Sequence, residues 1–193
     1  RSRGLGDVYK RQILNSVGEP DLKTEVFGTK MDMPIFLSPT AMQSLYHPDG
    51  DKASARAAEK FGTIYSMSTM ASFSIEEIAN LSSGPKIFQL YIHKDQSITD
   101  DLIDRCKRAN FNGMCITVDT IVAGNRERDH RTGFTTPPKF TLDSLMSFAM
   151  RPQWVFNYFT NKKFELANLK DKVEKGTNIA QSVMGYINEQ YDP

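Results

Sequence analysis

The sequence predicts an α/β protein, an incomplete (β/α)8 TIM barrel with about the first four βα units and a long loop after the fourth strand. From Met33 onward, short apolar runs alternate with amphipathic ones, which is typical of βα units around a parallel sheet. The strand starts are spaced by roughly 25 to 30 residues, and eight such units take about 250 residues. A chain of 193 residues therefore has room for half of a barrel.

Four apolar runs are predicted to be strands, and their near-continuous apolar character is typical of strands buried on both faces. They are residues 34–37 (PIFL), 63–67 (TIYSM), 86–91 (KIFQLY) and 113–118 (GMCITV). Helices are predicted between them, over 51–61, 74–81 and 97–110. Ser74 and Glu77 fit a capping box at the start of the second helix. Gly62 and Gly113 are each expected to close a helix and start a strand.

Composition and motifs exclude several classes of protein. The net charge of +1 gives no global field for a polyanion, so no nucleic-acid partner is expected. The turn after the first run, SPTAM, lacks the glycines of a dinucleotide-binding turn or a P-loop. The three histidines are too scattered for a metal site. No apolar run approaches the roughly 20 residues of a membrane span, and the two cysteines are expected to be free thiols, as in a cytoplasmic protein.

Polar residues gather where the predicted strands end, which is where a parallel barrel carries its reacting groups. They are Pro39, Thr40 and Ala41 after the first run, Ser68 after the second, Gln89 and Tyr91 on the third, and Thr117 and Asp119 on or after the fourth. A polar residue at a strand end is more often a helix cap or a turn former than a ligand contact. Asp119 is different, because a carboxylate that closes an apolar strand needs a partner.

Four motifs occur in order along the chain: SPTAMQSLYHPDGDKASARAA, GTIYSMSTMAS followed by SIEEIA, FQLYIHKD, and ITVDTIVAGNRERDHRTGF. Together they resemble the FMN-dependent α-hydroxy-acid dehydrogenase and oxidase family. The long segment of residues 136–169 is more similar to the loop of its L-lactate and mandelate dehydrogenases than to the shorter loop of its soluble oxidases. The resemblance runs from about residue 13 to the end. It implies an FMN-binding barrel of which this chain is the N-terminal half.

The resemblance also implies a reaction and roles for the strand-end residues. An L-2-hydroxy acid, in the first place L-lactate, is expected to be oxidised to the 2-keto acid, with electrons passed through FMN to a quinone or cytochrome. The backbone of Pro39, Thr40 and Ala41 and the side chains of Ser68, Gln89 and Thr117 are expected to bind FMN, Tyr91 and Arg126 the substrate, and Asp119 the catalytic histidine. That histidine belongs to the second half, so the chain alone is expected to be inactive.

The segment after the fourth strand is expected to be an insertion. We expect residues 1–12 to be a non-native or disordered leader, 13–193 to be the N-terminal half of the barrel domain, and 140–190 to be an inserted loop or helical segment. Residues 140–165 combine aromatic and basic side chains, which suits peripheral contact with an anionic membrane such as the inner membrane. A helix that covers the barrel is the other interpretation. The full-length protein is expected to be a homo-oligomer.

Three alternative functions remain open from the sequence. The first is a soluble 2-hydroxy-acid oxidase that uses O2. The second is another FMN barrel enzyme, such as an isomerase of phosphorylated substrates, which would use basic phosphate-binding residues in place of Tyr91 and Asp119. The third is a non-catalytic remnant that binds through its aromatic segment.

Overall fold

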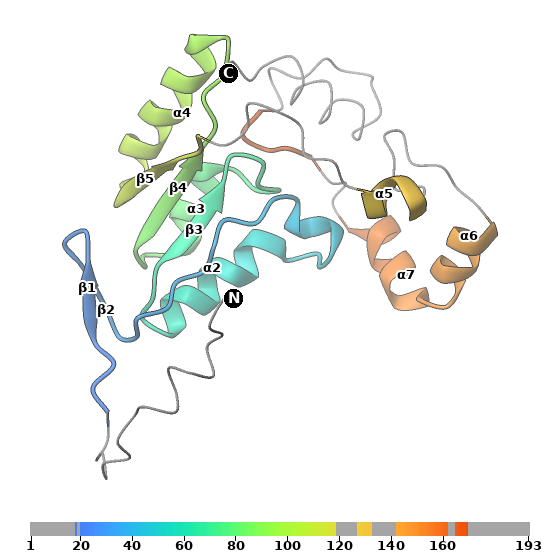
Figure 1. The fold of residues 1–193 in the computed structure, drawn as a ribbon, viewed down its shortest axis with the longest axis horizontal. Helices are drawn as coiled ribbons and strands as arrows, with labels where there is room; N and C mark the ends of the chain where they lie inside the picture. Colours follow the sequence, from blue (N-terminus) through green and yellow to red (C-terminus); the bar gives the residue numbers. More distant parts are fainter. Residues whose placement is uncertain (1–17, 19, 119–126, 133–141, 162–164, 170–193) are drawn as a thin grey trace, which may run out of the picture.

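A parallel three-stranded sheet forms the centre of the molecule (Figure 1). The computed structural model describes residues 18, 20–118, 127–132, 142–161 and 165–169. The strands β3 (Tyr65–Ser68), β4 (Lys86–Leu90) and β5 (Gly113–Ile116) lie side by side in sequence order. Parallel strands in sequence order, each joined to the next through a helix, are the arrangement of a (β/α)8 barrel.

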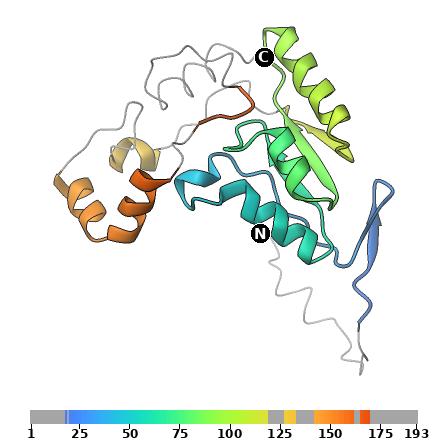
Figure 2. The same cartoon turned by 180° about the vertical axis from the view of Figure 1, so that it is seen from behind.

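Three helices connect the strands. Helix α2 (Gly50–Lys60) leads into β3, α3 (Ile75–Leu81) joins β3 to β4, and α4 (Gln96–Arg108) joins β4 to β5. Helix α2 packs against β3 and α3, and α4 packs against α3 and β4. Seen from behind, α3 lies in front of the strands (Figure 2). These three helices and the last three predicted strands are confirmed, with ends that differ from the prediction by at most two residues.

The helix ends follow the sequence signals with one exception. The capping box forms, since Ser74 Oγ accepts from the Glu77 N–H at 3.1 Å and Glu77 Oε2 accepts from the Ser74 N–H at 3.0 Å. After α2, Gly62 has a φ of 58°, a left-handed conformation that glycine adopts easily. After α4, the left-handed residue is Asn110, with a φ of 54°. Gly113 starts β5, as predicted, but does not close the helix.

The first predicted strand, residues 34–37, is wrong as a strand. Only Leu37 forms a bridge, to Tyr65 of β3. Its N–H donates to Ile64 O at 3.0 Å, and its carbonyl accepts from the Ser66 N–H at 3.1 Å. Pro34 has no N–H to donate, and Ile35 and Phe36 are exposed, so little burial favours a longer ladder. The segment still lies beside β3, at the position of a first barrel strand.

Burial differs between the strands. All four residues of β3 are buried and β4 is nearly so, which confirms the prediction for these two strands. The prediction is wrong for β5, where Met114, Cys115 and Ile116 are exposed. Within the part of the chain that the structure describes, β5 is the last strand of the sheet, so its outer edge has no neighbour. Cys115 and the buried Cys106 are both free thiols.

The hydrophobic core lies between the strands and the helices. Strand β3 contributes Tyr65 and Met67, and β4 contributes Phe88 and Leu90. The helices add small and branched side chains that fit between these larger ones. The helical members are Ala55, Ala58, Ile75, Ile78, Ile98, Leu102 and Cys106. Leu166 and Leu169, which lie within the predicted insertion of residues 140–190, belong to the same core.

An antiparallel hairpin precedes the sheet and was not predicted. Its strands are β1 (Thr24–Val26) and β2 (Thr29–Met31), joined by Phe27 and Gly28 with φ of 51° and 72°. Two consecutive left-handed residues are the type I′ turn that suits a two-residue hairpin. The sequence did not reveal it because Phe-Gly is not one of the usual Asn-Gly or Asp-Gly signals of this turn.

In the described ranges after β5 the structure has three short helices: α5 (Glu127–Thr132), α6 (Leu142–Ala149) and α7 (Pro152–Thr160). Both views show them beside the 3-10 helix η1 (Gln43–Leu45) and away from the strands (Figures 1 and 2). Trp154 makes this contact, since its indole N–H donates to Leu45 O at 2.9 Å. The rings of Phe148 and Tyr158 both stack on the Trp154 ring, with centroids 5.5 and 5.2 Å from its centroid. Among the described residues, no helix is long and apolar enough to cross a membrane.

Candidate FMN and substrate site

A row of hydrogen-bonded side chains crosses the carboxyl ends of the three parallel strands. Ser68 Oγ donates to Gln89 Oε1 at 3.2 Å, and Gln89 Nε2 donates to Thr117 Oγ1 at 2.6 Å. The row brings together three of the side chains that the sequence placed at strand ends, Ser68, Gln89 and Thr117. All three are neutral, and Gln89 is only 6% exposed.

Thr69 fixes the geometry of the row, a role that the sequence analysis did not assign to it. Its Oγ1 donates to Gln89 O at 2.6 Å and accepts from the Tyr91 N–H at 3.3 Å. Its N–H donates to Gln89 O and, at 3.4 Å, to Gln89 Oε1. Thr69 therefore sets both the amide orientation of Gln89 and the position of Tyr91. The available signal was its polar side chain next to Ser68 at the end of an apolar run.

The loop that contains Pro39, Thr40 and Ala41 lies beside the loop after β3. The Met42 N–H donates to Met70 O at 3.0 Å, which joins the two loops. Thr40 O accepts from Gln43 Nε2 at 3.3 Å. Pro39 and Thr40 are exposed and Ala41 is half-buried, so backbone of this loop is accessible.

The proposed substrate-side residues are only partly placed. Tyr91 directly follows β4, is half-buried and packs against the core. Asp119 and Arg126 lie outside the described residues, as does the expected leader at 1–12. The structure thus brings Tyr91 next to the row of Ser68, Gln89 and Thr117.

The comparison with protein families shows which family the chain belongs to. The model of the FMN-dependent dehydrogenases matches residues 9–193, nearly the whole chain. The chain belongs to the FMN-dependent dehydrogenase family. The expected cofactor, FMN, is thereby confirmed as that of the family.

Relatives of known sequence or structure agree with this membership. Glycolate oxidase 1 of Zea mays is 44% identical over 138 residues, which are 72% of this chain and 37% of the relative. The crystal structure of the monotopic membrane protein (S)-mandelate dehydrogenase matches with a TM-score of 0.83 and 28% identity, over 96% of this chain and 50% of that one. A lactate oxidase from Pediococcus acidilactici matches with a TM-score of 0.61 and 36% identity, over 72% and 38%.

The extent of these matches shows how much of the fold the chain carries. The chain spans about 37% of the length of the curated glycolate oxidases and half of the mandelate dehydrogenase. The prediction of an incomplete (β/α)8 barrel, about its first half, is confirmed.

The residues of the row fit the ring of FMN in chemical type. The polar edge of an isoalloxazine ring carries carbonyl oxygens and ring nitrogens, which pair with neutral donors and acceptors. Ser68, Gln89 and Thr117 supply such groups at the carboxyl end of the strands, where barrel enzymes bind their ligands. The loop that contains Thr40 and Ala41 is joined to the loop after β3 by the hydrogen bond from the Met42 N–H to Met70 O.

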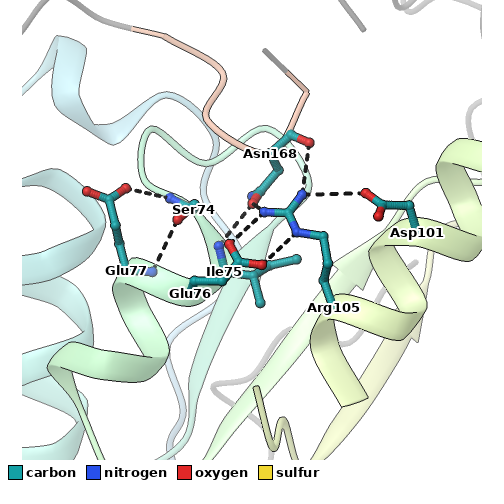
Figure 3. A network of polar contacts seen from close by, with 7 residues as sticks. All are labelled: Ser74, Ile75, Glu76, Glu77, Asp101, Arg105 and Asn168. Carbon is teal, nitrogen blue, oxygen red and sulfur yellow. Dashed lines mark hydrogen bonds and ion pairs between the residues drawn. The ribbon is translucent and has the colours of Figure 1, made fainter. Parts of the chain in front are cut away.

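A network of polar contacts binds the segment after α7 to the helices of the FMN-dependent dehydrogenase fold (Figure 3). Asn168 Oδ1 accepts from the Ile75 N–H at 3.0 Å, at the start of α3, and from Arg105 Nη2 at 3.2 Å. Arg105 of α4 also donates to both carboxylate oxygens of Glu76, each at 2.7 Å. This bidentate contact lowers the pKa of Glu76 to about 2. Asn168 therefore joins the segment after α7 to two helices at once.

Histidine 93, two residues beyond Tyr91, is buried and carries no charge at neutral pH. It is 2% exposed, and burial lowers the pKa of its imidazole to about 4. The backbone N–H of His93 donates to Thr99 Oγ1 at 3.1 Å, which anchors the start of α4. In the described ranges, no three His, Cys, Asp or Glu side chains gather as metal ligands.

Proposed function

We propose that the enzyme to which this chain belongs oxidises a small L-2-hydroxy acid, in the first place L-lactate, to the 2-keto acid and passes the electrons to a quinone or cytochrome. The observation that carries this proposal is the row of Ser68, Gln89 and Thr117 at the strand ends of a chain of the FMN-dependent dehydrogenase family. Tyr91 stands beside that row.

In this proposal the residues of the chain bind and orient. Backbone at Pro39, Thr40 and Ala41 lies against the ring of FMN, and Ser68, Gln89 and Thr117 bind its polar edge. Bound FMN supplies the two-electron acceptor for the oxidation. The Tyr91 hydroxyl orients the hydroxy acid.

Asp119 and Arg126 complete the proposed roles. Asp119 orients the histidine base of the second half of the barrel and stabilises its protonated form, which retains the proton removed from the substrate hydroxyl. Arg126 attracts the substrate carboxylate.

Two kinds of electron acceptor are candidates, O2 and a membrane-linked quinone or cytochrome. A soluble oxidase that uses O2 is favoured by the 44% identity with a glycolate oxidase. A membrane-linked dehydrogenase is favoured by the match to the structure of the monotopic mandelate dehydrogenase, with a TM-score of 0.83 against 0.61 for the lactate oxidase. It is also favoured by the apolar surface of α6 and α7, where Met146, Phe156 and Phe159 are exposed. We propose that this surface contacts an anionic membrane.

The test uses the full-length enzyme, meaning this chain joined to the part of the family's barrel that it does not include. Bound flavin is quantified first, and its anaerobic bleaching is then followed with L-lactate, glycolate and (S)-mandelate. We expect bleaching to be fastest with L-lactate, and reoxidation to be faster with a quinone than with O2. Faster bleaching by glycolate with rapid reoxidation by O2 would replace the proposal with the oxidase, and no bleaching by any of the three acids would overturn both.

The Tyr91→Phe variant tests the substrate side separately. It lacks the hydroxyl but keeps the ring that packs against the core. We expect unchanged flavin content and slower bleaching. Bleaching at the wild-type rate would remove Tyr91 from the proposed site.

A further inference from the structure

A carboxylate is buried in the first turn of α2, on the face of the helix that packs against the sheet. Asp51 is 0% exposed and lies one and two helical turns before Ala55 and Ala58, which are buried on the same face. A carboxylate at such a position is unusual, because removing its charge from water is costly unless donors satisfy it. Burial raises the pKa of Asp51, and its hydrogen bonds oppose that rise.

Both oxygens of Asp51 accept hydrogen bonds from the region of β3. Oδ1 accepts from the Tyr65 hydroxyl at 2.9 Å, and Oδ2 accepts from the Ser72 N–H at 3.0 Å. Ser72 lies in the loop that follows β3. The carboxylate thus joins α2 both to the strand and to the loop beyond its carboxyl end.

The chain of hydrogen bonds continues from Ser72 into the loop that contains Thr40 and Ala41. Ser72 Oγ accepts from the Ser44 N–H at 3.1 Å. A second bond, from the Met42 N–H to Met70 O at 3.0 Å, runs parallel to it. Asp51 is therefore linked to the loop of residues 38–46 through a single residue, Ser72.

These two loops carry groups that the proposed function places against FMN. Ser68 Oγ accepts from the Met70 N–H at 3.2 Å, so the position of the loop after β3 sets the position of the Ser68 hydroxyl. Thr40 O accepts from Gln43 Nε2, and Gln43 Oε1 accepts from Ser54 Oγ of α2 at 2.7 Å. Helix α2 is the element that contacts both loops.

We propose that Asp51 is a positioning residue for the cofactor, and this rests on the proposed function. Its carboxylate holds the loop after β3 and the loop of residues 38–46 at a fixed separation, so that the Ser68 hydroxyl and the backbone at Thr40 and Ala41 meet the same ring. Each donor has its own carboxylate oxygen, Oδ1 for Tyr65 and Oδ2 for Ser72. Two oxygens in one plane satisfy both and fix their relative positions.

The experiment measures FMN affinity of the full-length enzyme after the flavin has been removed and titrated back, together with the absorption spectrum of the bound flavin. Asp51→Ala leaves the Ser72 N–H without its acceptor, and we expect FMN affinity to fall by at least about ten-fold with a changed flavin spectrum. Asp51→Asn retains one acceptor oxygen, and we expect it to restore part of the affinity.

A matched control exists on the same helix. Glu59 near the other end of α2 also accepts from a serine, namely from the Ser83 N–H at 3.0 Å and the Ser83 hydroxyl at 2.6 Å. The loop that contains Ser83 precedes β4 and lies at the amino end of the strands. Glu59→Ala is expected to leave FMN affinity and the flavin spectrum unchanged.

The Ser72→Ala variant decides the matter if Asp51→Ala does not fold. It keeps the backbone N–H that donates to Asp51 and removes the hydroxyl that accepts from the Ser44 N–H. We expect weaker FMN binding and an altered spectrum with little loss of stability. Wild-type binding and spectrum in Ser72→Ala, or in a folded Asp51→Ala, would overturn the positioning role while leaving the proposed function intact. If the wild-type enzyme itself did not bind FMN, both proposals would fail.

Discussion

Gln89 is the residue on which the row at the strand ends depends, because its amide is both acceptor and donor. Its oxygen accepts from Ser68 and from the Thr69 N–H, and its nitrogen donates to Thr117. Within the described residues, Ser68 and Thr117 share no direct side-chain hydrogen bond and are joined only through Gln89. A change at Gln89 therefore separates Ser68 from Thr117.

We predict that Gln89→Met weakens FMN binding by about ten-fold or more in the full-length enzyme. Methionine has a similar volume but cannot satisfy the hydroxyls of Ser68 and Thr117, and each unsatisfied polar group costs about 1–3 kcal/mol. Flavin fluorescence during titration with FMN measures the affinity. Gln96→Met changes an exposed glutamine of α4 and is expected to bind as the wild type does. Equal affinity of the two variants would show that the row does not hold the cofactor.

His93 gives the protein a dependence of stability on pH. Its folded pKa of about 4 lies below its ordinary value of 6.5, so the unfolded chain binds the proton more tightly. Above about pH 6.5 the imidazole is neutral in both states, and His93 does not lower the free energy of unfolding. As the pH falls from 6.5 toward 4, the unfolded chain takes up the proton first, and the free energy of unfolding falls. A shift of this size corresponds to at most about 3 kcal/mol.

We predict that His93→Leu flattens the pH dependence of the unfolding free energy between about pH 4 and 6.5. Chemical unfolding of the full-length enzyme at several pH values measures it. His47→Gln, at an exposed histidine, should keep the wild-type slope. An unchanged slope in His93→Leu would mean that other groups titrate in this range.

The sequence allowed part of the site to be predicted at this scale. Ser68, Gln89 and Thr117 could be found because strand ends are recognisable from apolar runs, and strand ends are where barrels carry function. Asp51 could not, because its role depends on the side of α2 that faces β3 and on a loop 21 residues away. Its sequence signal was a carboxylate in register with the apolar stripe of Ala55 and Ala58.

At the scale of elements, the segment 165–169 anchors the chain where it returns from α7. Leu166 and Leu169 are buried in the core, and Asn168 caps the start of α3 while it contacts Arg105 of α4. The segment thus holds one end of the α6 and α7 region to the barrel. Trp154 holds its middle through Leu45.

We predict that Asn168→Ala lowers the stability of the full-length enzyme by about 1 kcal/mol, as loss of a helix cap does. It should also make the α7 region more open to proteolysis, because the anchor of its return segment is weakened. Asn161→Ala removes a bond that Asn161 makes to Asn157 O within the same exposed region, and serves as the control. Equal stability and cleavage of the two variants would contradict the anchoring role.

We predict that Phe156→Ser combined with Phe159→Ser abolishes most binding to anionic vesicles. These side chains are 66% and 79% exposed on α7, and aromatic burial drives interfacial binding. Co-sedimentation of the full-length enzyme with phosphatidylglycerol vesicles, at low and high salt, measures it. Phe61→Ser, at the end of α2, removes an exposed phenylalanine elsewhere. Undiminished sedimentation of the double variant would leave α6 and α7 as a cover on the barrel.

At the scale of the whole molecule, β5 is exposed in the part of the chain that the structure describes. Ile116 and Val118 are 55% and 79% exposed at and just after β5. An exposed strand edge with apolar side chains favours pairing with another chain.

The order of elements and their lengths were predictable from periodicity, but the hairpin β1–β2 and the reduced first strand were not. Both depend on backbone conformation and on hydrogen bonds to distant residues such as Gly62 and Ile64.

We predict that the chain in isolation self-associates, and that Ile116→Lys reduces this association, because a charge at the edge opposes strand pairing. Light scattering against protein concentration measures the association. Met146→Lys, on α6, is the control for a general gain in charge. A monomeric wild-type chain with a sharp unfolding transition would contradict the prediction.

The measurement that tests the central claim most directly is a crystal structure of the full-length enzyme with FMN bound. We expect the polar edge of the ring to lie within hydrogen-bond distance of Ser68, Gln89 and Thr117, with the backbone at Thr40 and Ala41 against the ring. A flavin bound elsewhere, with the Ser68, Gln89 and Thr117 contacts unchanged and no approach to the ring, would contradict it.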